Sequence, residues 1–399
     1  MNEGVDMKKI LIISDVPTHP KNEGCNVRIY NLINNMKELN FDVYFLFVYR
    51  RNRDCNISDM KKFIGKEKIF IYKYNKYKKF LKPKFLFFES IRKLLKTMGL
   101  GKKIIIHYKV DDDYFNSLNK YIKKLNSRYS FNIAWVEYVW LSKALNNFND
   151  NTLKVIDTLD IYANRENVYL KNNQFPQGRY YTEQEEKKGL SRANYVIAIQ
   201  NNEERYFSQG LKNGVKTVTV GNFIRLFKPN VVHNKKYIFV GSNNDLNIYS
   251  VNYFINNVLP IVKEKDSNSV FIIVGGVCKS VPDNDNYIKL GYVDNLDEVY
   301  NDARLVINPI MSGTGLNIKT IEALGYSKPL VSTTCGIKGL EFDKKIAEIA
   351  DDDKMFAEKI INVLNDDELA KELSNNAFEF SNNYNKEIIN NLKEILYKK

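Results

Sequence analysis

A glycine turn followed by a single glutamate gives the clearest chemical signal in this sequence. Residues 306–340 predict a short apolar strand, a turn through Gly313 and Gly315, and a helix from 317 to 324. Because the turn ends at a helix N-terminus, free backbone N–H groups and the helix dipole would favour an anion such as a diphosphate. Glu322 lies on that helix beside its apolar face, where its carboxylate needs a hydroxyl partner. The glycines alone also fit an ordinary strand-to-helix crossover.

Apolar runs of four to seven residues alternate with amphipathic helical stretches along most of the chain, which is typical of parallel sheets covered on both faces. The predicted strands form two sets: 9–14, 42–48, 133–136, 153–157, 195–199 and 218–220, then 237–240, 270–274, 287–290, 305–308 and 330–332. The sequence therefore predicts an α/β chain with a Rossmann-like first domain over 1–221, a linker over 222–236 and a second domain over 237–383.

The spacing of six residues in the glycine turn and its helix resembles the donor-binding segment of retaining glycosyltransferases of family 4, which have the GT-B fold: Pro309, Gly313, Gly315, Lys319, Glu322 and Ala323. The segments 15–28, 239–254 and 290–294 are similar to other parts of that family. The resemblance implies two Rossmann-like domains facing a central cleft, with a C-terminal helix, 384–399, crossing back to the first domain.

The resemblance also implies roles for individual residues. Glu322 would bind the ribose of a nucleotide-sugar, and the other donor-binding positions would be Gly313, Thr314, Gly315, Leu316, Asn317, Ile318, Lys319, Gly241, Ser242 and Val293. Many family members carry a second glutamate where this chain has Thr314. They also commonly carry an arginine in the loop after the first strand of the second domain, where this chain has a run of Gly, Ser and Asn over 241–247.

In the first domain, the resemblance directs attention to the segment after the strand 153–157. Related enzymes often read Asp-Thr-His-Asp here, whereas this chain has Leu159 in place of the histidine, and leucine cannot exchange a proton. Asp157 and Asp160 are therefore candidate catalytic residues beside Glu322, and Arg165 is a candidate cleft residue. An alternative interpretation is that the two acids only cap a helix and a turn.

A glycine loop before the first predicted helix provides further cleft candidates. His19 lies in this loop, Gly24 ends it, and Arg28 follows on the helix; the resemblance places such an arginine near the cleft. A solvated histidine and a surface cation are the alternatives.

No catalytic metal or other cofactor is expected. The pair Asp283 and Asp285 lies before a predicted strand rather than after one, which favours a solvated turn, and the acidic runs 111–113 and 351–353 are interpreted in the same way. Cys25, Cys55, Cys278 and Cys335 are too far apart in sequence for a zinc motif or a disulfide framework. Without an apparent signal peptide or membrane-spanning run, we expect a cytoplasmic protein.

The formal charge of +13, from 60 basic and 47 acidic residues, attracts phosphate-rich partners. Residues 71–103 interleave lysine with aromatic and aliphatic residues, which suits an anionic membrane surface at the inner face of the cell membrane. Lysines lying along an ordinary amphipathic helix and an RNA-binding surface are the alternatives.

Together these features predict a glycosyltransferase that moves a sugar from a nucleotide-diphosphate donor to a glycan or a lipid-linked acceptor of the cell envelope. The resemblance to family 4 implies that the transfer retains the anomeric configuration. A nucleotide-sugar epimerase-like enzyme, a catalytically impaired nucleotide-sugar-binding protein and, on charge alone, a nucleic-acid binder are the competing hypotheses.

Overall fold

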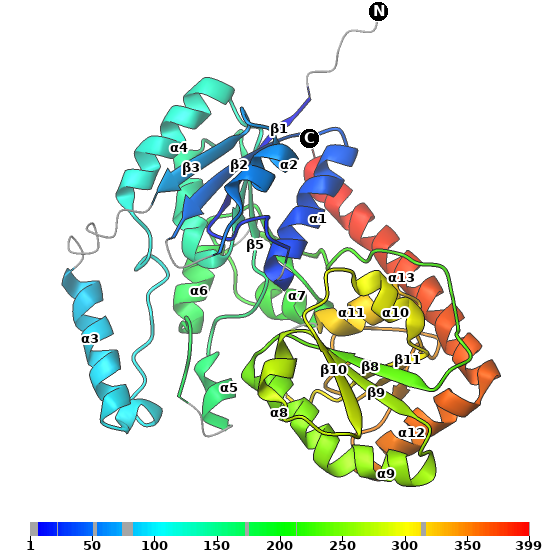
Figure 1. Ribbon diagram of the computed structural model, residues 1–399. Coiled ribbons are helices and arrows are strands. Elements are labelled where there is room, and N and C mark those ends of the chain that lie inside the picture. The colour runs from blue at the N-terminus through cyan, green and yellow to red at the C-terminus, as the bar shows by residue number, and fades with distance from the viewer. Residues whose placement is uncertain are drawn as a thin grey trace, which may run out of the picture. The chain divides into compact units, whose positions relative to one another are not determined.

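The computed structural model describes residues 7–21, 23–50, 54–73, 83–171, 175–212, 214–312 and 317–398, without the side chains of residues 83–85. The chain divides into two compact units, Met1–Gly221 with Ile389–Lys399, and Asn222–Ile388. Each unit is built around one parallel sheet with helices on both faces (Figure 1). The predicted α/β architecture with two Rossmann-like domains is confirmed.

The sheet of the first unit has seven strands in the order β3-β2-β1-β4-β5-β6-β7. Residues 10–13, in the interior strand β1, are fully buried, as a continuous apolar run in a doubly covered sheet requires. The strands are β1 (Lys9–Ser14), β2 (Asp42–Tyr49), β3 (Ile69–Lys73), β4 (Ile133–Glu137), β5 (Leu153–Asp157), β6 (Tyr195–Ala198) and β7 (Lys216–Thr219). The edge strand β3 was not predicted from the sequence.

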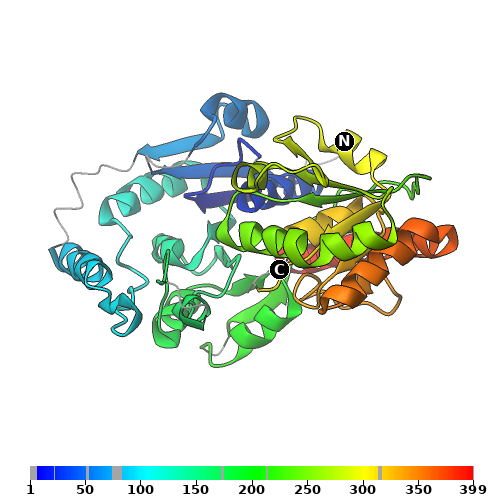
Figure 2. The same cartoon turned by 60° about the horizontal axis from the view of Figure 1, so that its bottom comes forward.

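The helices of the first unit connect these strands, and most of them cover the faces of the sheet. They are α1 (Gly24–Glu38), α2 (Ile57–Ile64), α3 (Pro83–Thr97), α4 (Asn116–Tyr129), α5 (Glu166–Lys171), α6 (Glu183–Leu190) and α7 (Asn201–Ser208), with 3-10 turns η2 (Leu100–Lys102) and η3 (Val139–Asn147). Helix α3 stands apart from the sheet in both Figure 1 and Figure 2.

The second sheet has six strands in the order β10-β9-β8-β11-β12-β13. They are β8 (Lys236–Val240), β9 (Val270–Val274), β10 (Tyr287–Gly291), β11 (Leu305–Asn308), β12 (Leu330–Ser332) and the unpredicted two-residue β13 (Glu348–Ile349). The helical elements are α8 (Asp245–Tyr253), the π-helical turn η4 (Phe254–Val258), α9 (Leu259–Lys265), η5 (Gly276–Ser280), α10 (Leu296–Asp302), α11 (Ile318–Gly325), α12 (Asp353–Asn365) and α13 (Asp367–Leu396).

Alternation along the strands divides the core of the second unit into two layers. Tyr237 and Phe239 of β8 pack on one face with α8, η4, α9 and α12, whereas Ile238 packs on the other face with α10 and α11. Helix α13 is a single element of 30 residues, and its last turns belong to the first unit, where the Tyr397 hydroxyl donates to the Leu39 carbonyl over 2.8 Å. Among the described helices, none is both long and apolar enough to cross a membrane.

A buried ion pair joins α1 to the far half of the first sheet. Arg28 donates from Nε and Nη2 to the two carboxylate oxygens of Asp157, over 3.0 and 2.9 Å. Its Nη1 and Nη2 also donate to the carbonyls of Gly221 and Val220, each over 2.8 Å. Asp157 is fully buried and Arg28 is 5% exposed, so the pair is held away from water.

Replacing Arg28 with Met should destabilise the first unit by about 3–5 kcal/mol, because the Asp157 carboxylate would stay buried without its partner. The double variant Arg28→Met/Asp157→Leu should lose less than Arg28→Met alone. Urea unfolding followed by tryptophan fluorescence tests this, since both tryptophans of the chain, Trp135 and Trp140, lie in the first unit. Additive losses in the double variant would contradict a direct pair.

Candidate functional site

The topology of the second sheet places the predicted donor residues at its switch point. The chain runs outward from β8 through β9 and β10 and then crosses back to β11 on the other side of β8. In open parallel sheets, ligands bind beyond the carboxyl ends of the two strands that flank such a reversal. The loop after β8 and the loop from β11 to α11 therefore form the edge where a ligand is expected.

The loop after β8 is packed backbone to backbone against the loop after β9. A Cβ on Gly275, which has φ of +96°, would lie 2.4 Å from the carbonyl oxygen of Gly241, so only glycine fits there. The Gly241 carbonyl in turn accepts from the Val277 amide over 3.1 Å. Ser242 is held by Asn247, whose Nδ2 donates to the Ser242 carbonyl over 2.8 Å.

The second loop carries most of the predicted donor-binding residues. Gly313, Thr314, Gly315 and Leu316 lie outside the described residues. The flanking Asn317 precedes α11 as its N-cap but makes no side-chain cap hydrogen bond; its Nδ2 donates to the Cys335 carbonyl over 3.1 Å instead. The first-turn amides of α11, beginning at the exposed Ile318, therefore receive no acceptor from the N-cap side chain.

Lys319 connects the two loops of the switch point. Its Nζ donates to Oδ1 of Asn247 over 2.5 Å and lies 5.2 Å from the centre of the Phe239 ring. Burial lowers the pKa of Lys319 to about 8, because the ammonium form is less well solvated there. Lys319 thus brings a cation from α11 to the loop after β8, where the sequence shows only small polar residues.

Glu322 lies one turn further along α11 and on the same side as Lys319. Its Oε2 accepts from the Tyr300 hydroxyl over 3.0 Å, and burial raises the pKa of Glu322 although this hydrogen bond acts in the opposite direction. The Tyr300 ring stacks on Tyr326 at 4.0 Å, and Tyr326 stacks on Phe227 at 4.2 Å. The stacked rings hold the Tyr300 hydroxyl in place against Glu322. The sequence identified Glu322 but not the aromatic residues that position it.

The other candidates of the second unit lie further from this pair in the sequence. Val293, in the loop between β10 and α10, is partly buried against the core cluster that includes Tyr300. In the described part of the chain, no group of three or more His, Cys, Asp or Glu side chains is placed to hold a metal ion. Asp283 forms an ion pair with Lys289 at 2.5 Å.

In the first unit, the structure separates the two predicted catalytic aspartates. Asp157 is occupied by Arg28, as described above, whereas Asp160 is paired with Arg165 at 3.0 Å in the loop after β5. Between the two aspartates in the sequence, Leu159 has φ of +58°, a left-handed conformation that is strained for a branched side chain. Asp160 and Arg165 are thus presented together on a constrained loop.

Two buried glutamates lie beneath the segment that follows β5. Glu186 accepts from the backbone amides of Tyr162 and Ala163 over 2.7 and 3.2 Å. Glu203 accepts from Nε2 of Gln200 over 2.9 Å. Burial raises the pKa of both carboxyls to about 7. No sequence pattern singles out these two glutamates, because only the fold makes them buried.

The glycine-loop candidates are distributed around the start of α1. Gly24 is the first residue of that helix. His19 packs edge-on against the rings of Tyr30 and Phe63 at 5.4 and 5.6 Å, and its Nδ1 lies 3.0 Å from the Thr18 hydroxyl. Burial lowers the pKa of His19, which disfavours its charged form.

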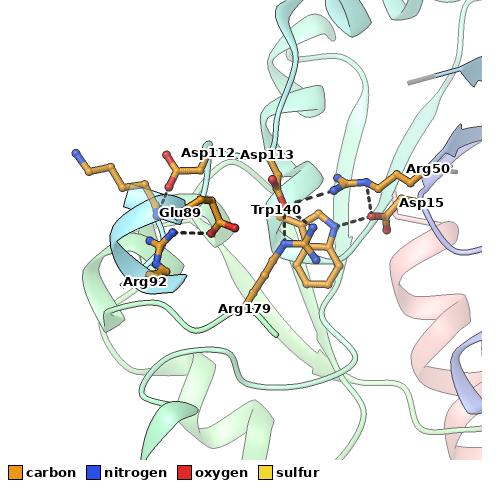
Figure 3. Close-up of polar contacts among 9 residues, drawn as sticks. Asp15, Arg50, Glu89, Arg92, Asp112, Asp113, Trp140 and Arg179 are labelled. Carbon is orange, nitrogen blue, oxygen red and sulfur yellow. Dashed lines mark hydrogen bonds and ion pairs between the residues drawn. The ribbon is translucent and has the colours of Figure 1, made fainter. Parts of the chain in front are cut away.

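A charged cluster that sequence reasoning missed lies at the switch point of the first sheet, between β1 and β4 (Figure 3). Asp15 Oδ2 accepts from Trp140 Nε1 over 3.2 Å and pairs with Arg50 Nε at 2.9 Å. Asp113 joins Arg50 at 3.4 Å and Arg179 Nε at 2.8 Å.

This cluster combines ions with an aromatic surface. The Arg179 guanidinium lies 4.3 Å from the centre of the Trp140 ring, which stacks on Tyr138 at 4.2 Å. The expectation that the acidic run 111–113 is merely solvated is wrong, because Asp113 pairs with two arginines and Asp111 pairs with Arg192 at 2.7 Å. Arg50 directly follows β2, and this position at the carboxyl end of a predicted strand could have identified it as a candidate site residue.

Comparisons with known proteins agree with this architecture. Residues 234–366 match the family model described as Glycosyl transferases group 1. A 44.6 kDa protein in the cps region of Klebsiella pneumoniae is 28% identical over 163 residues. That alignment covers 37% of this chain and 42% of the relative, so the chain matches less than half of the relative's length.

Similar solved structures cover nearly the whole chain. TarM of S. aureus, crystallised as a variant with fondaparinux, alpha-GlcNAc-glycerol and UDP, has a TM-score of 0.66 and 14% identity over 98% of this chain and 100% of its own. Anabaena HepE with UDP and glucose has a TM-score of 0.61 and 13% identity over 99% and 100%. The pneumococcal O-GlcNAc transferase GtfA with UDP and GlcNAc has a TM-score of 0.63 and 11% identity over 98% and 100%. At these identities the similarity establishes the fold, the GT-B architecture.

The two buried glutamates predict an acid-favouring pH dependence for the first unit. Their pKa of about 7 in the folded protein exceeds the ordinary value of 4.5, so the folded state retains protons that the unfolded state has released. Stability should therefore fall as pH rises from about 5 to 7.5, by on the order of 2–3 kcal/mol per group. Tryptophan-detected urea unfolding across this range measures it.

The variant Glu186→Gln/Glu203→Gln should lose most of this slope. Glu183→Gln is the matched control, because Glu183 lies in the same helix as Glu186 and is about half exposed. An unchanged slope in the double variant would assign the pH dependence to other groups.

Proposed function

We propose that this chain is a retaining glycosyltransferase of the family-4 type. In this proposal the second unit binds a nucleotide-diphosphate sugar, and its hexosyl or related group passes to a hydroxyl of a glycan or lipid-linked acceptor of the cell envelope. Such a transfer needs a held and neutralised diphosphate, a stabilised oxocarbenium-like sugar and an aligned acceptor hydroxyl.

One observation carries the donor assignment: Lys319 and Glu322 lie on the same side of α11, directly behind the loop at the switch point. The match of residues 234–366 to the group 1 family model supports it. A diphosphate would lie against the first-turn amides of α11, and the Glu322 carboxylate would accept from the two ribose hydroxyls.

Lys319 also supplies a positive charge that the loop after β8 lacks. The loop after β8 has small polar residues where related enzymes commonly carry an arginine, and Lys319 reaches this loop through Asn247. A diphosphate bound beside Lys319 would stabilise its ammonium form and would in turn be neutralised by it. The proposal requires no metal ion for this step.

Support for an acceptor of the cell envelope comes from the neighbours and from the first unit. Fondaparinux and alpha-GlcNAc-glycerol appear in the TarM complex, and the Klebsiella relative lies in a cps region. Beyond the carboxyl ends of β1 and β2, the partly exposed Arg50 is held by the buried Asp15, and its guanidinium can donate to sugar hydroxyls. Asp160 and Arg165 are the other candidates on this unit.

A protein that binds a nucleotide-sugar without transferring it is the second candidate. It is favoured by the Arg28–Asp157 pair, which occupies one predicted catalytic acid, and by Leu159 between the two aspartates. Sugar transfer to any member of a panel of glycan and lipid-linked acceptors would exclude this candidate. Formation of an epimeric sugar product from donor alone would instead indicate an epimerase-like enzyme.

Glu322→Gln should weaken the binding of the nucleotide by about 1.5–3 kcal/mol, because a charged acceptor of two ribose hydrogen bonds becomes neutral. A thermal-shift screen of nucleotide-sugars first selects the donor, and calorimetry with the corresponding nucleoside diphosphate then measures the loss. Glu298→Gln on the neighbouring helix α10, an exposed position, is the matched control. Equal affinities of Glu322→Gln and the parent would refute the donor site.

Binding of the nucleoside diphosphate should weaken as pH rises through about 8, since Lys319 is charged below its pKa and neutral above it. Lys319→Arg should remove this decline, because arginine stays charged. Lys319→Met should bind weakly at all pH values. Calorimetric titrations of the three proteins between about pH 7 and 9 give the comparison, and a decline that persists in Lys319→Arg would rule out Lys319 as its origin.

A further inference from the structure

Helix α3 presents a row of large apolar side chains to solvent. Phe87 and Leu94 on α3 and Met98, the residue directly after it, are 62%, 58% and 60% exposed, and helical spacing places Phe87 and Leu94 on the same side of α3. Ile104, just beyond η2, is 50% exposed as well. Exposed large apolar groups concentrated in one short segment are of the kind that marks an interaction site. We refer to these four residues as the α3 apolar row.

The other side of α3 is fixed to the first unit through Arg92. Its Nε and Nη2 donate to the carbonyls of Ile106 and His107, each over 2.9 Å. Its Nη1 donates to Glu89 over 2.8 Å, as Figure 3 shows. The guanidinium also lies 3.6 Å from the centre of the Tyr108 ring. Because these contacts hold one side of the helix against the unit, the opposite side, with the apolar row, faces solvent.

The charge around the row is strongly positive. Residues 71–103 contain eleven basic residues and one acidic residue, Glu89, which is paired with Arg92. Lys93 and Lys96 on α3 and Lys103 after η2 are exposed. Residues 74–82, which carry four of the lysines, lie outside the described part of the chain. The described lysines alone give the segment an excess of positive charge.

We propose that the α3 apolar row docks on the surface of an anionic lipid bilayer. Phenyl and aliphatic side chains would enter the boundary between headgroups and acyl chains, while the long lysine stems let their ammonium groups reach lipid phosphates. The composition favours a bilayer over single-stranded RNA, since Leu94, Met98 and Ile104 offer no ring on which a base could stack. This inference goes beyond the proposed function and does not require a bound donor.

Vesicle flotation of the full chain tests the proposal. The protein should float with vesicles of phosphatidylcholine containing roughly a third of phosphatidylglycerol, and not with phosphatidylcholine alone. Leu94→Ser/Met98→Ser should reduce the bound fraction by about tenfold or more, and Lys93→Gln/Lys96→Gln by a similar factor that shrinks at high salt. These side chains are exposed, so the variants should fold normally.

Matched controls separate this surface from general stickiness. Tyr249 and Met355 in the second unit are 59% and 48% exposed, and Tyr249→Ser/Met355→Ser should float like the parent. Equal flotation of Leu94→Ser/Met98→Ser and the parent would overturn the proposal. The proposal would also be overturned if the protein did not bind the anionic vesicles. Self-association or RNA binding that the same variants abolish would then identify the surface as a different kind of interface. Nucleotide affinity, measured separately, distinguishes this outcome from failure of the donor site.

Discussion

The Arg28–Asp157 ion pair is the constraint on which the geometry of the first unit depends. It ties α1, the end of β5 and the carbonyls of Val220 and Gly221 into one buried assembly. Glu137, fully buried at the end of β4, shares this environment, and burial together with the nearby Asp157 charge raises the pKa of Glu137 well above its ordinary value. The positive charge of Arg28 stabilises the buried carboxyl groups of Asp157 and Glu137 at the ends of β5 and β4. Asp157 is thus the buried partner of Arg28 in this structure.

Much of the fold could be predicted because it depends on local patterns. Continuous apolar runs identified the central strands, and the glycine turn identified the start of α11. The strands β3 and β13 were missed since both lie at sheet edges, where burial is incomplete and the apolar signal is short. Strand order, which creates the switch points, follows from crossovers that no local pattern encodes.

The candidate site was predictable only in part for the same reason. Glu322 and Lys319 were recognised from their spacing, but the hydroxyl of Tyr300 and the amide of Asn247 that hold them come from other segments. The cluster of Asp15, Arg50 and Asp113 draws on three separate loops, so no spacing rule could assemble it. Conversely, the sequence alone showed that Leu159 replaces the histidine that related enzymes often carry. The structure adds that the backbone of Leu159 is left-handed.

The polar contacts of Arg92 extend beyond α3. They end on residues 106–108, and the Tyr108 amide donates to the Tyr180 carbonyl over 3.1 Å, while His107 pairs with Glu166 at 2.9 Å. Tyr181 in turn exchanges backbone hydrogen bonds with Tyr162 and Asn164, next to Asp160 and Arg165. A helix resting on lipid would therefore set the height of that loop above the headgroups.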